Sequence, residues 1–220
     1  MSNLLYLLIN FLIIIFPFIL SFTKKYYFLN RASSVFLSTL TVSIPFIFWD
    51  IIVTNRGHWA FNPKFTLTYR LLGLPIEEIL FFVTVPYSCI FLYHYCKKHF
   101  GAGNRDIGKY SKNILALVFV FLGFLSEKEY TILVMVSTGI LLISLSNKYI
   151  TSLSYLVYIF LGFILFTIFN YLLTSIPIVT YSKQYTSGIR LATIPIEDYF
   201  YNFVLLTLYA KAYDFFSRQS

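Results

Sequence analysis

Long apolar stretches separated by short polar loops dominate the chain and predict membrane-spanning helices. A helix needs roughly 20 mainly apolar residues to cross a bilayer. The fourth and fifth stretches are short and share a tight polar turn at Glu127-Lys128-Glu129. The pattern predicts an all-α polytopic membrane protein with about seven transmembrane helices, six being the alternative count. The predicted helices cover residues 3–22, 33–49, 76–96, 114–125, 130–145, 153–174 and 196–216.

The composition indicates that lipid surrounds much of the chain. Hydrophobic residues make up 58% of the 220 residues, charged residues make up 12%, and the mean hydropathy is +0.74. A soluble domain needs about 25% charged residues to cover its surface. The net charge of +8 is not gathered in a basic run, so no nucleic-acid partner is expected. Cys89 and Cys96 lack a metal-ligand spacing, and no metal site is predicted.

The distribution of basic residues predicts the orientation. With seven helices, eleven Lys and Arg residues fall on the side of the C-terminus and six on the other side. Cytoplasmic loops carry an excess of Lys and Arg. We therefore expect a multi-pass protein of the cell membrane with a cytoplasmic C-terminus. The first apolar stretch lacks a basic region and a small-residue cleavage site, so no secretory signal peptide is expected.

A sequence repeat relates the two halves of the chain. Arg70-Leu-Leu-Gly-Leu-Pro-Ile-Glu-Glu78 and Arg190-Leu-Ala-Thr-Ile-Pro-Ile-Glu-Asp198 share five of nine residues at an offset of 120, and Asp50 corresponds to Asn170 at the same offset. A shift of four helices keeps both motifs on one side of the membrane, as in parallel repeats about an axis along the membrane normal. The predicted units are a first repeat at 1–110, a linker helix at 111–128 and a second repeat at 129–220.

Each motif places two acids at the start of an apolar helix. Proline and carboxylates there also make an ordinary helix start, because the carboxylates oppose the helix dipole. Ionisable groups at membrane depth are costly, however, and are usually functional. Burial raises the pKa of a carboxyl group and a nearby Arg lowers it, so unlike surroundings would give one protonated acid and one ionised base. The candidates are Glu77, Glu78, Glu197 and Asp198.

The loop before the first motif gathers polar and aromatic residues. It contains both tryptophans, Trp49 and Trp59, with His58 beside the second. Tryptophans are also common in the interfacial belt, and one His without a second His or Cys nearby is poor evidence for a metal. Loops often carry function, so this loop is a candidate site wall or lid. The supporting candidates are Asp50, Asn55, Arg56, Trp59, Asn62, Arg70 and Arg190, the last two being alternatively interfacial arginines.

The loop and the first motif together resemble the lycopene cyclase domain family, the small, all-helical membrane type found as two subunits or as a fusion. The resemblance rests on Asp50…Asn55-Arg56-Gly57…Trp59-Ala-Phe61-Asn62-Pro63 and on Gly73-Leu-Pro75-Ile-Glu77-Glu78-Ile-Leu-Phe81-Phe82. The Pro-x-Glu-Glu/Asp signature of that family recurs at 195–198, whereas the second half lacks the Trp-Ala-Phe-Asn-Pro loop. The resemblance covers essentially the whole chain, as in the fused form.

The resemblance implies a cyclase that acts within membrane lipid on lycopene or a related linear carotene with ψ-ends. A carboxylic acid would protonate the terminal double bond, the next alkene would attack the cation, and loss of a proton would close a β-ionone ring without redox change. Aromatic faces would stabilise the cation. The four motif acids would supply acid and base, with Asp50 as a helper. Since adjacent helical residues diverge by about 100°, one acid of each pair is expected to face the site.

Several alternatives remain open at this point. No Gly-x-Gly-x-x-Gly fingerprint is present, so no flavin or nucleotide cofactor is expected. A small transporter would fit the repeats, but its helices should be broken near the midplane. A retinal protein needs a Lys in the middle of its last helix, and Lys211 lies near the end. A non-catalytic partner subunit of a carotenoid-modifying complex, the ring type, cyclisation at one or two ends, and homo-oligomerisation are all left open.

Overall fold

The structure, a computed structural model, describes residues 2–23, 26–101 and 110–218 and is mostly helical. Every segment predicted as a spanning helix forms a helix, and the two shortest of them pack against each other as α4 and α5. The helices are η1 (Ser2–Leu4), α1 (Leu5–Ser21), η2 (Leu29–Arg31), α2 (Ala32–Asn55), α3 (Ile76–His99), α4 (Ser111–Leu125), α5 (Glu129–Ser144), α6 (Asn147–Ile150), α7 (Leu153–Ser175) and α8 (Ile196–Ser217).

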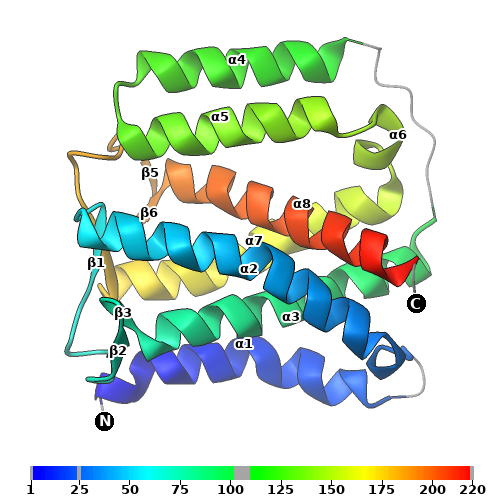
Figure 1. Cartoon of the computed structure of the whole chain (residues 1–220), viewed down its shortest axis with the longest axis horizontal. Helices are drawn as coiled ribbons and strands as arrows, with labels where there is room; N and C mark the ends of the chain where they lie inside the picture. Colours follow the sequence, from blue (N-terminus) through cyan, green and yellow to red (C-terminus); the bar gives the residue numbers. More distant parts are fainter. Residues whose placement is uncertain (1, 24–25, 102–109, 219–220) are drawn as a thin grey trace.

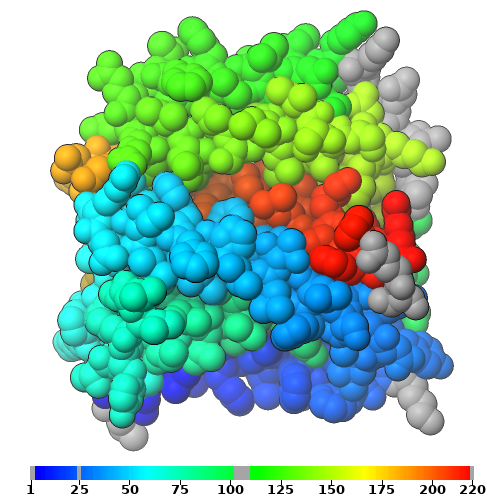
Figure 2. Space-filling model, viewed as in Figure 1, coloured from blue at the N-terminus to red at the C-terminus, as the bar shows by residue number. Residues whose placement is uncertain are grey.

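The long helices lie side by side along the long axis of the molecule (Figure 1). The N-terminus and all the short strands lie at one end, and the C-terminus lies at the other. Helix α4 packs on α5 at one edge, and α8 contacts both α2 and α5. In the space-filling view, α8 is visible between these two helices (Figure 2). The arrangement brings the loops before α3 and α8 to the same end of the bundle.

Three helices in the described part of the chain are long and apolar enough to cross a membrane: Leu29–Asn55, Ile76–His99 and Leu153–Ser175. Helices α1, α4 and α5 have 17, 15 and 16 residues. At about 1.5 Å per residue they fall short of a hydrocarbon core of about 30 Å. Seven crossings therefore stay a prediction. Four basic residues of the orientation argument, Lys24, Lys25, Arg105 and Lys109, lie outside the described residues.

A two-stranded hairpin precedes each motif helix. Strands β2 (Arg70–Leu71) and β3 (Leu74–Pro75) pair before α3, and β5 (Arg190–Leu191) and β6 (Ile194–Pro195) pair before α8. Each proline is the last residue before its helix, in extended conformation. In the first hairpin Gly73 has a φ of +95°, and a Cβ there would lie 2.9 Å from Asn55 Oδ1. The positive φ favours glycine at that turn, and a Cβ there would also displace the Asn55 side chain.

A third strand pair joins the two halves. Strand β1 (Trp59–Phe61) pairs antiparallel with β4 (Val179–Tyr181). Its central residues are Ala60 and Thr180, which correspond to each other at the repeat offset of 120. A residue meets its own counterpart only on a twofold axis, so the pseudo-twofold axis of the molecule passes through this pair.

A polar cluster at the other end of the bundle follows the same axis. The Tyr93 hydroxyl donates to Asp214 Oδ2 at 2.7 Å. The Tyr213 hydroxyl lies 2.8 Å from His94 Nδ1. Tyr93 and Tyr213 are counterparts at offset 120, as are His94 and Asp214. The hydrogen bonds are thus exchanged between α3 and α8, and they tie the two motif helices together far from the motifs.

Candidate active site

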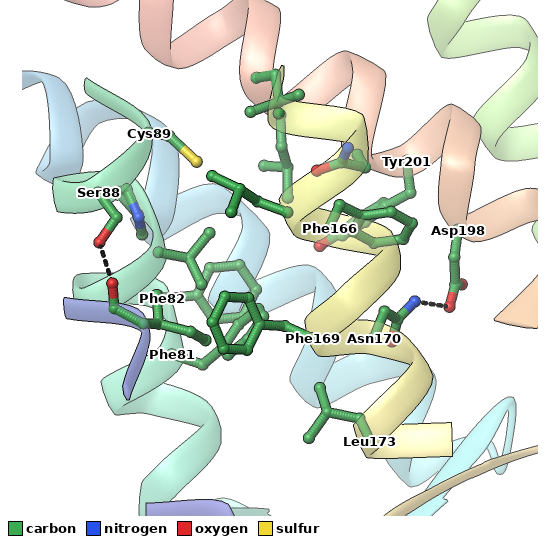
Figure 3. Close-up of a pocket in the computed structure, with 18 of the residues that line it drawn as sticks. Phe81, Phe82, Ser88, Cys89, Phe166, Phe169, Asn170, Leu173, Asp198 and Tyr201 are labelled. Atoms are coloured by element: carbon green, nitrogen blue, oxygen red, sulfur yellow. Dashed lines mark hydrogen bonds between the residues drawn. The ribbon is translucent and has the colours of Figure 1, made fainter. Parts of the chain in front are cut away.

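A cavity of about 450 Å³ lies between helices α1, α2, α3, α7 and α8 and the β1–β4 pair. Its walls are mainly aromatic and aliphatic. Figure 3 shows Phe169 reaching from α7 toward Phe82 on α3, while the neighbouring Asn170 bonds Asp198 on α8. Polar side chains enter the cavity chiefly from the motif acids and their neighbours. The cavity is therefore an apolar chamber with a few acids in its wall.

One acid of each motif lines this cavity, and the other fastens a loop. Glu78 and Asp198 are in the cavity wall. Glu77 is fully buried, and its Oε1 accepts the backbone N–H of Leu67 at 2.6 Å. Glu197 is equally buried, and its Oε1 accepts the backbone N–H of Ser187 at 2.6 Å. The remaining oxygen of both has no hydrogen-bond partner among the described residues. The repeat thus preserves one loop anchor and one cavity acid in each half.

The first acid centre is a pair of carboxyl groups. Asp50 and Glu78 both line the cavity and both are buried, and Asp50 Oδ2 has no hydrogen-bond partner among the described residues. Asp50 Oδ1 accepts the indole N–H of Trp59 at 2.8 Å and the hydroxyl of Thr54 at 3.2 Å. Glu78 Oε2 accepts the phenol of Tyr6 in a short hydrogen bond. An ionised carboxylate has no proton to donate, so a hydrogen bond between two carboxyl groups requires one proton shared between them.

The second acid centre is a single carboxylate held by three donors. Asp198 Oδ1 accepts the phenol of Tyr130 at 2.9 Å. Its Oδ2 accepts the phenol of Tyr181 at 2.7 Å and the amide of Asn170 at 3.0 Å. Burial raises the pKa of Tyr181, in the loop region, well above its ordinary value, so its phenol keeps the proton that it donates. Three donors to one carboxylate favour its ionised form.

Aromatic rings from both halves lie between the two acid centres. The Trp59 ring is 5.3 Å from that of Tyr130 and 6.0 Å from that of Tyr181, edge to face in both cases. Tyr201, on α8, also lines the cavity and lies 6.5 Å from Tyr130. Trp59 and Tyr181 are partners in the β1–β4 pair. The strand pair therefore joins two acid centres into one aromatic-walled site.

The other predicted residues lie outside the cavity, where they support the loops. Asn55 Nδ2 contacts the carbonyl of Leu72 at 3.4 Å, and Asn62 Oδ1 accepts the N–H of Lys64 at 3.0 Å. Arg70 and Arg190 are exposed, and each donates to a carbonyl in its own hairpin, at 3.1 Å and 2.6 Å respectively. Arg56 pairs with Glu129 of α5 at 2.6 Å.

His58 packs between the two halves beneath the loop. Its ring is fully buried and stacks on Tyr185 with centroids 3.9 Å apart. Its Nε2 lies 3.4 Å from Glu129 Oε2. Burial lowers the pKa of His58, and Glu129 offsets this in part. In the part of the chain that the structure describes, no cluster of three metal-ligating side chains exists.

Several cavity residues had no sequence signal strong enough to select them. Tyr6, Tyr130, Tyr181 and Tyr201 are four of 19 tyrosines. Asn170 was recognised as the counterpart of Asp50 at offset 120, and that relation was the available signal. Tyr6 and Tyr130 bind equivalent acids but are 124 residues apart, so a search at the repeat offset misses them.

Comparison with known proteins gives one match. A family model described as lycopene cyclase matches residues 3–96 and again residues 127–216. The matched regions include both motifs, both acid centres and the β1–β4 pair. No curated protein and no solved structure matches the chain.

Proposed function

Because the chain belongs to the lycopene cyclase family, we propose that it forms β-ionone rings on lycopene or a related linear carotene by proton-initiated, redox-neutral cyclisation. Family membership supports carotenoid cyclase activity and implies a carotenoid substrate. The ring type and the mechanism are the part that we add. The observation that carries the mechanism is the placement of Glu78 and Asp198 in the wall of one apolar, aromatic cavity.

The proposed chemistry needs one proton in and one proton out. A carboxyl O–H bond breaks as its proton adds to the terminal double bond, which leaves a tertiary carbocation. The next double bond attacks that cation, and the new carbon–carbon bond closes a six-membered ring. A base then removes a ring proton and restores a double bond. The product has the mass of the substrate, and no electron acceptor is required.

The cavity suits a carbocation. Aromatic faces such as those of Trp59 and Tyr201 attract a desolvated cation by about 2 kcal/mol or more. The apolar walls exclude water, which would otherwise trap the cation as an alcohol. An ionised Asp198 adds a negative charge close to the developing positive one. These features support cyclisation over hydration.

The cavity wall also reaches the lipid-facing surface. Leu12 and Phe16 of α1 and Leu165 of α7 line the cavity, and their exposed fractions are 47%, 67% and 46%. An exposed apolar side chain on a membrane helix faces acyl chains. A carotene dissolved in the bilayer can therefore enter between α1 and α7, with its ψ-end leading, and its tail can stay in lipid.

We further propose a multi-pass arrangement in the cell membrane with the C-terminus in the cytoplasm. The proposal retains the division into repeats at 1–110 and 129–220 with a linker at 111–128. The strands and the N-terminus lie together at the end opposite the C-terminus (Figure 1). In this orientation, both acid centres lie near the outer face. Fusion of a reporter to each terminus, with cleavage or activity assayed from each side, tests the orientation.

The function is tested by expression in a bacterial host that accumulates lycopene. The chain should yield a cyclic carotene of unchanged mass, identified by chromatography and mass spectrometry. The double variant Glu78→Gln, Asp198→Asn should leave lycopene intact. Glu127→Gln is the matched control, because Glu127 is exposed in the turn between α4 and α5, far along the chain from either motif.

Two outcomes would contradict the proposal. If the membrane-inserted chain leaves lycopene and longer linear carotenes unchanged, cyclisation is excluded, and transport or a partner role would have to be considered. If the double variant cyclises as well as Glu127→Gln, the cavity acids do not carry the reaction.

A further inference from the structure

The two cavity acids have different partners, and the difference divides the work of catalysis between them. We propose that Glu78 delivers the proton to the terminal double bond, that Asp50 holds this proton on Glu78 beforehand, and that Asp198 accepts the proton that leaves the ring. This inference rests on the proposed function and assigns the roles within it. Asp50 is then a positioning residue, and Glu78 and Asp198 are catalytic residues.

The hydrogen bonds at the first centre locate the shared proton. Asp50 Oδ1 accepts two donors, from Trp59 and Thr54, and its buried Oδ2 has no partner among the described residues, in the same cavity wall as Glu78. Glu78 accepts one donor, from Tyr6. Donors stabilise the ionised form of a carboxyl group, so the better-supplied acid is the anion. The proton therefore sits on Glu78, and the ionised Asp50 accepts a hydrogen bond from the protonated Glu78.

The second centre has no carboxyl group in the position of Asp50. Asn170 occupies the equivalent position on α7, and it donates an N–H to Asp198 where Asp50 can only accept. Tyr130 and Tyr181 supply two further donors. All three bonds form with Asp198 ionised. An acid that is already a carboxylate has no proton to give but can take one.

The assignment balances over a catalytic cycle. The Glu78 O–H bond breaks and a C–H bond forms on the carotene. A ring C–H bond later breaks and its proton goes to Asp198. The enzyme then resets when a proton passes from Asp198 back to Glu78. Tyr181, whose phenol donates to Asp198, lines the same cavity as Glu78.

The rate–pH profile in isolated membranes separates the two roles. Cyclisation should fall at high pH when Glu78 loses its proton, and at low pH when Asp198 gains one. Tyrosines keep their protons throughout this range, so the carboxyl groups alone set both limbs. The described titratable side chains around the two acids are Tyr6, Asp50, Tyr130, Tyr181 and Tyr201, with Glu77 and Glu197 on the same helices as the acids.

Two reciprocal substitutions should move one limb each. Asp50→Asn removes the acceptor that holds the proton on Glu78, so the alkaline limb should move down by about 1 pH unit or more. Asn170→Asp gives Asp198 a carboxyl partner, so the acidic limb should move up by a similar amount. Glu127→Gln should move neither limb. A purely structural role for Asp50 would lower the rate at every pH and leave both limbs in place, and this result would overturn the assignment.

Deuterium uptake gives an independent test when a variant is too slow for a profile. Membranes in D2O that carry Glu78→Gln should return lycopene without deuterium, because the first protonation is lost. Membranes that carry Asp198→Asn should return lycopene with deuterium, because the cation forms and reverts. Each purified variant should elute at the same position as the parent chain. This control establishes that the variant is folded. Folded Asp198→Asn with unlabelled lycopene, or labelled lycopene from Glu78→Gln, would overturn the assignment.

The assignment and the function fail in different ways. If the parent chain forms no ring from any linear carotene, the proposed function is wrong. If the parent chain forms rings but Asp50→Asn extends activity to lower pH and leaves the alkaline limb unchanged, Glu78 acts as the base. In that case the function stands, and the roles of Glu78 and Asp198 are exchanged.

Discussion

The two halves of this chain build the same frame around their cavity acids and differ where the acid meets the preceding helix. Tyr6 and Tyr130 each donate a phenol to the cavity acid of their own half. Asp50 stands in one half where Asn170 stands in the other. In the proposed mechanism, exchange of one oxygen for an N–H group turns a pair of acids that shares a proton into a lone carboxylate. A nearly symmetric frame would thus hold an acid and a base.

Neither half completes this site alone. Trp59, from the first half, packs against Tyr130 and Tyr181 of the second. Its indole N–H meanwhile binds Asp50 of its own half at 2.8 Å. The second half has Val179 at the equivalent position and therefore no such donor. The aromatic wall is shared, but its hydrogen bond serves only the first acid centre.

Among substitutions that test the difference between the two halves, Glu78→Gln should have the largest effect on ring formation. Loss of the proton donor should reduce ring formation about 10²–10⁴-fold, the usual contribution of a general acid. Carotene extracted at fixed times from equal amounts of membrane-inserted protein measures it. Glu127→Gln, the same substitution at an exposed turn, should retain parental activity. Equal activity of the two variants would remove Glu78 from the mechanism.

The next effect should be on stability, and it should be larger in the second half, because Glu197 also accepts the Thr131 hydroxyl at 2.6 Å. Glu77→Ala and Glu197→Ala each remove the carboxylate that accepts a loop N–H at 2.6 Å. A hydrogen bond to a charged group contributes about 1.5–3 kcal/mol. Thermal unfolding of the purified variants in detergent should show a lower midpoint for both. The variants that stay folded should still form rings.

A contrary result at Glu77 would alter the assignment of the motif. If Glu77→Ala unfolds at the parental temperature and yet forms no ring, Glu77 takes part in the chemistry. The same comparison applies to Glu197. In that event, the residue concerned would be assigned to the chemistry together with the cavity acids, and its role would not be limited to holding a loop.

A smaller effect should follow from Trp59→Phe. The ring wall is largely kept, but Asp50 loses one of its donors. A loss of about 1.4 kcal/mol in the stabilisation of Asp50 corresponds to an activity about tenfold lower at neutral pH. Val179→Ala, at the equivalent strand position, should change activity less because it makes no hydrogen bond to an acid. An equal loss in both variants would indicate packing as the cause.

The smallest effect should be a pH dependence of stability that comes from His58. The lowered pKa of the buried His58 means that the folded chain binds fewer protons than the unfolded chain. The stability should therefore fall as the pH drops below about 6.5, the ordinary value for His. Thermal midpoints at pH 7.5 and 5.5 measure the slope. His58→Phe retains a ring to stack on Tyr185, and it should flatten this slope. An unchanged slope would assign the effect to other groups.

Hydropathy predicted the helices well because each is a run of apolar residues, and the run is visible without knowledge of the partner. It did not predict which acid of each motif faces the cavity. Glu77 and Glu78 differ by one residue, and their directions depend on how α3 is rotated against α1 and α2. That rotation is set by packing between segments distant in sequence. The sequence predicted that one acid of each pair faces the site, and the acids that line the cavity are Glu78 and Asp198.

The supporting residues were harder to predict for a different reason. Polar residues are rare in this chain, and five of them were therefore predicted to support the site. They make loop and hairpin contacts instead: Asn55, Arg56, Asn62, Arg70 and Arg190. The phenols that bind the acids resemble the chain's many other tyrosines. The first half has four more residues between Tyr6 and Asp50 than the second half has between Tyr130 and Asn170. Tyr6 and Tyr130 therefore do not align at the repeat offset of 120.

The pairing of Ala60 with Thr180 places a constraint on the history of the molecule. A segment that meets its own counterpart across a twofold axis is what an isologous interface between identical subunits presents. Two copies of a half-length ancestor would form this strand pair with one position facing itself. In such a dimer every substitution appears twice, so Asp50 and Asn170 could not have diverged. Once the two copies were encoded separately, as two subunits or within one chain, that identity no longer held, and one half could carry Asp50 while the other carried Asn170.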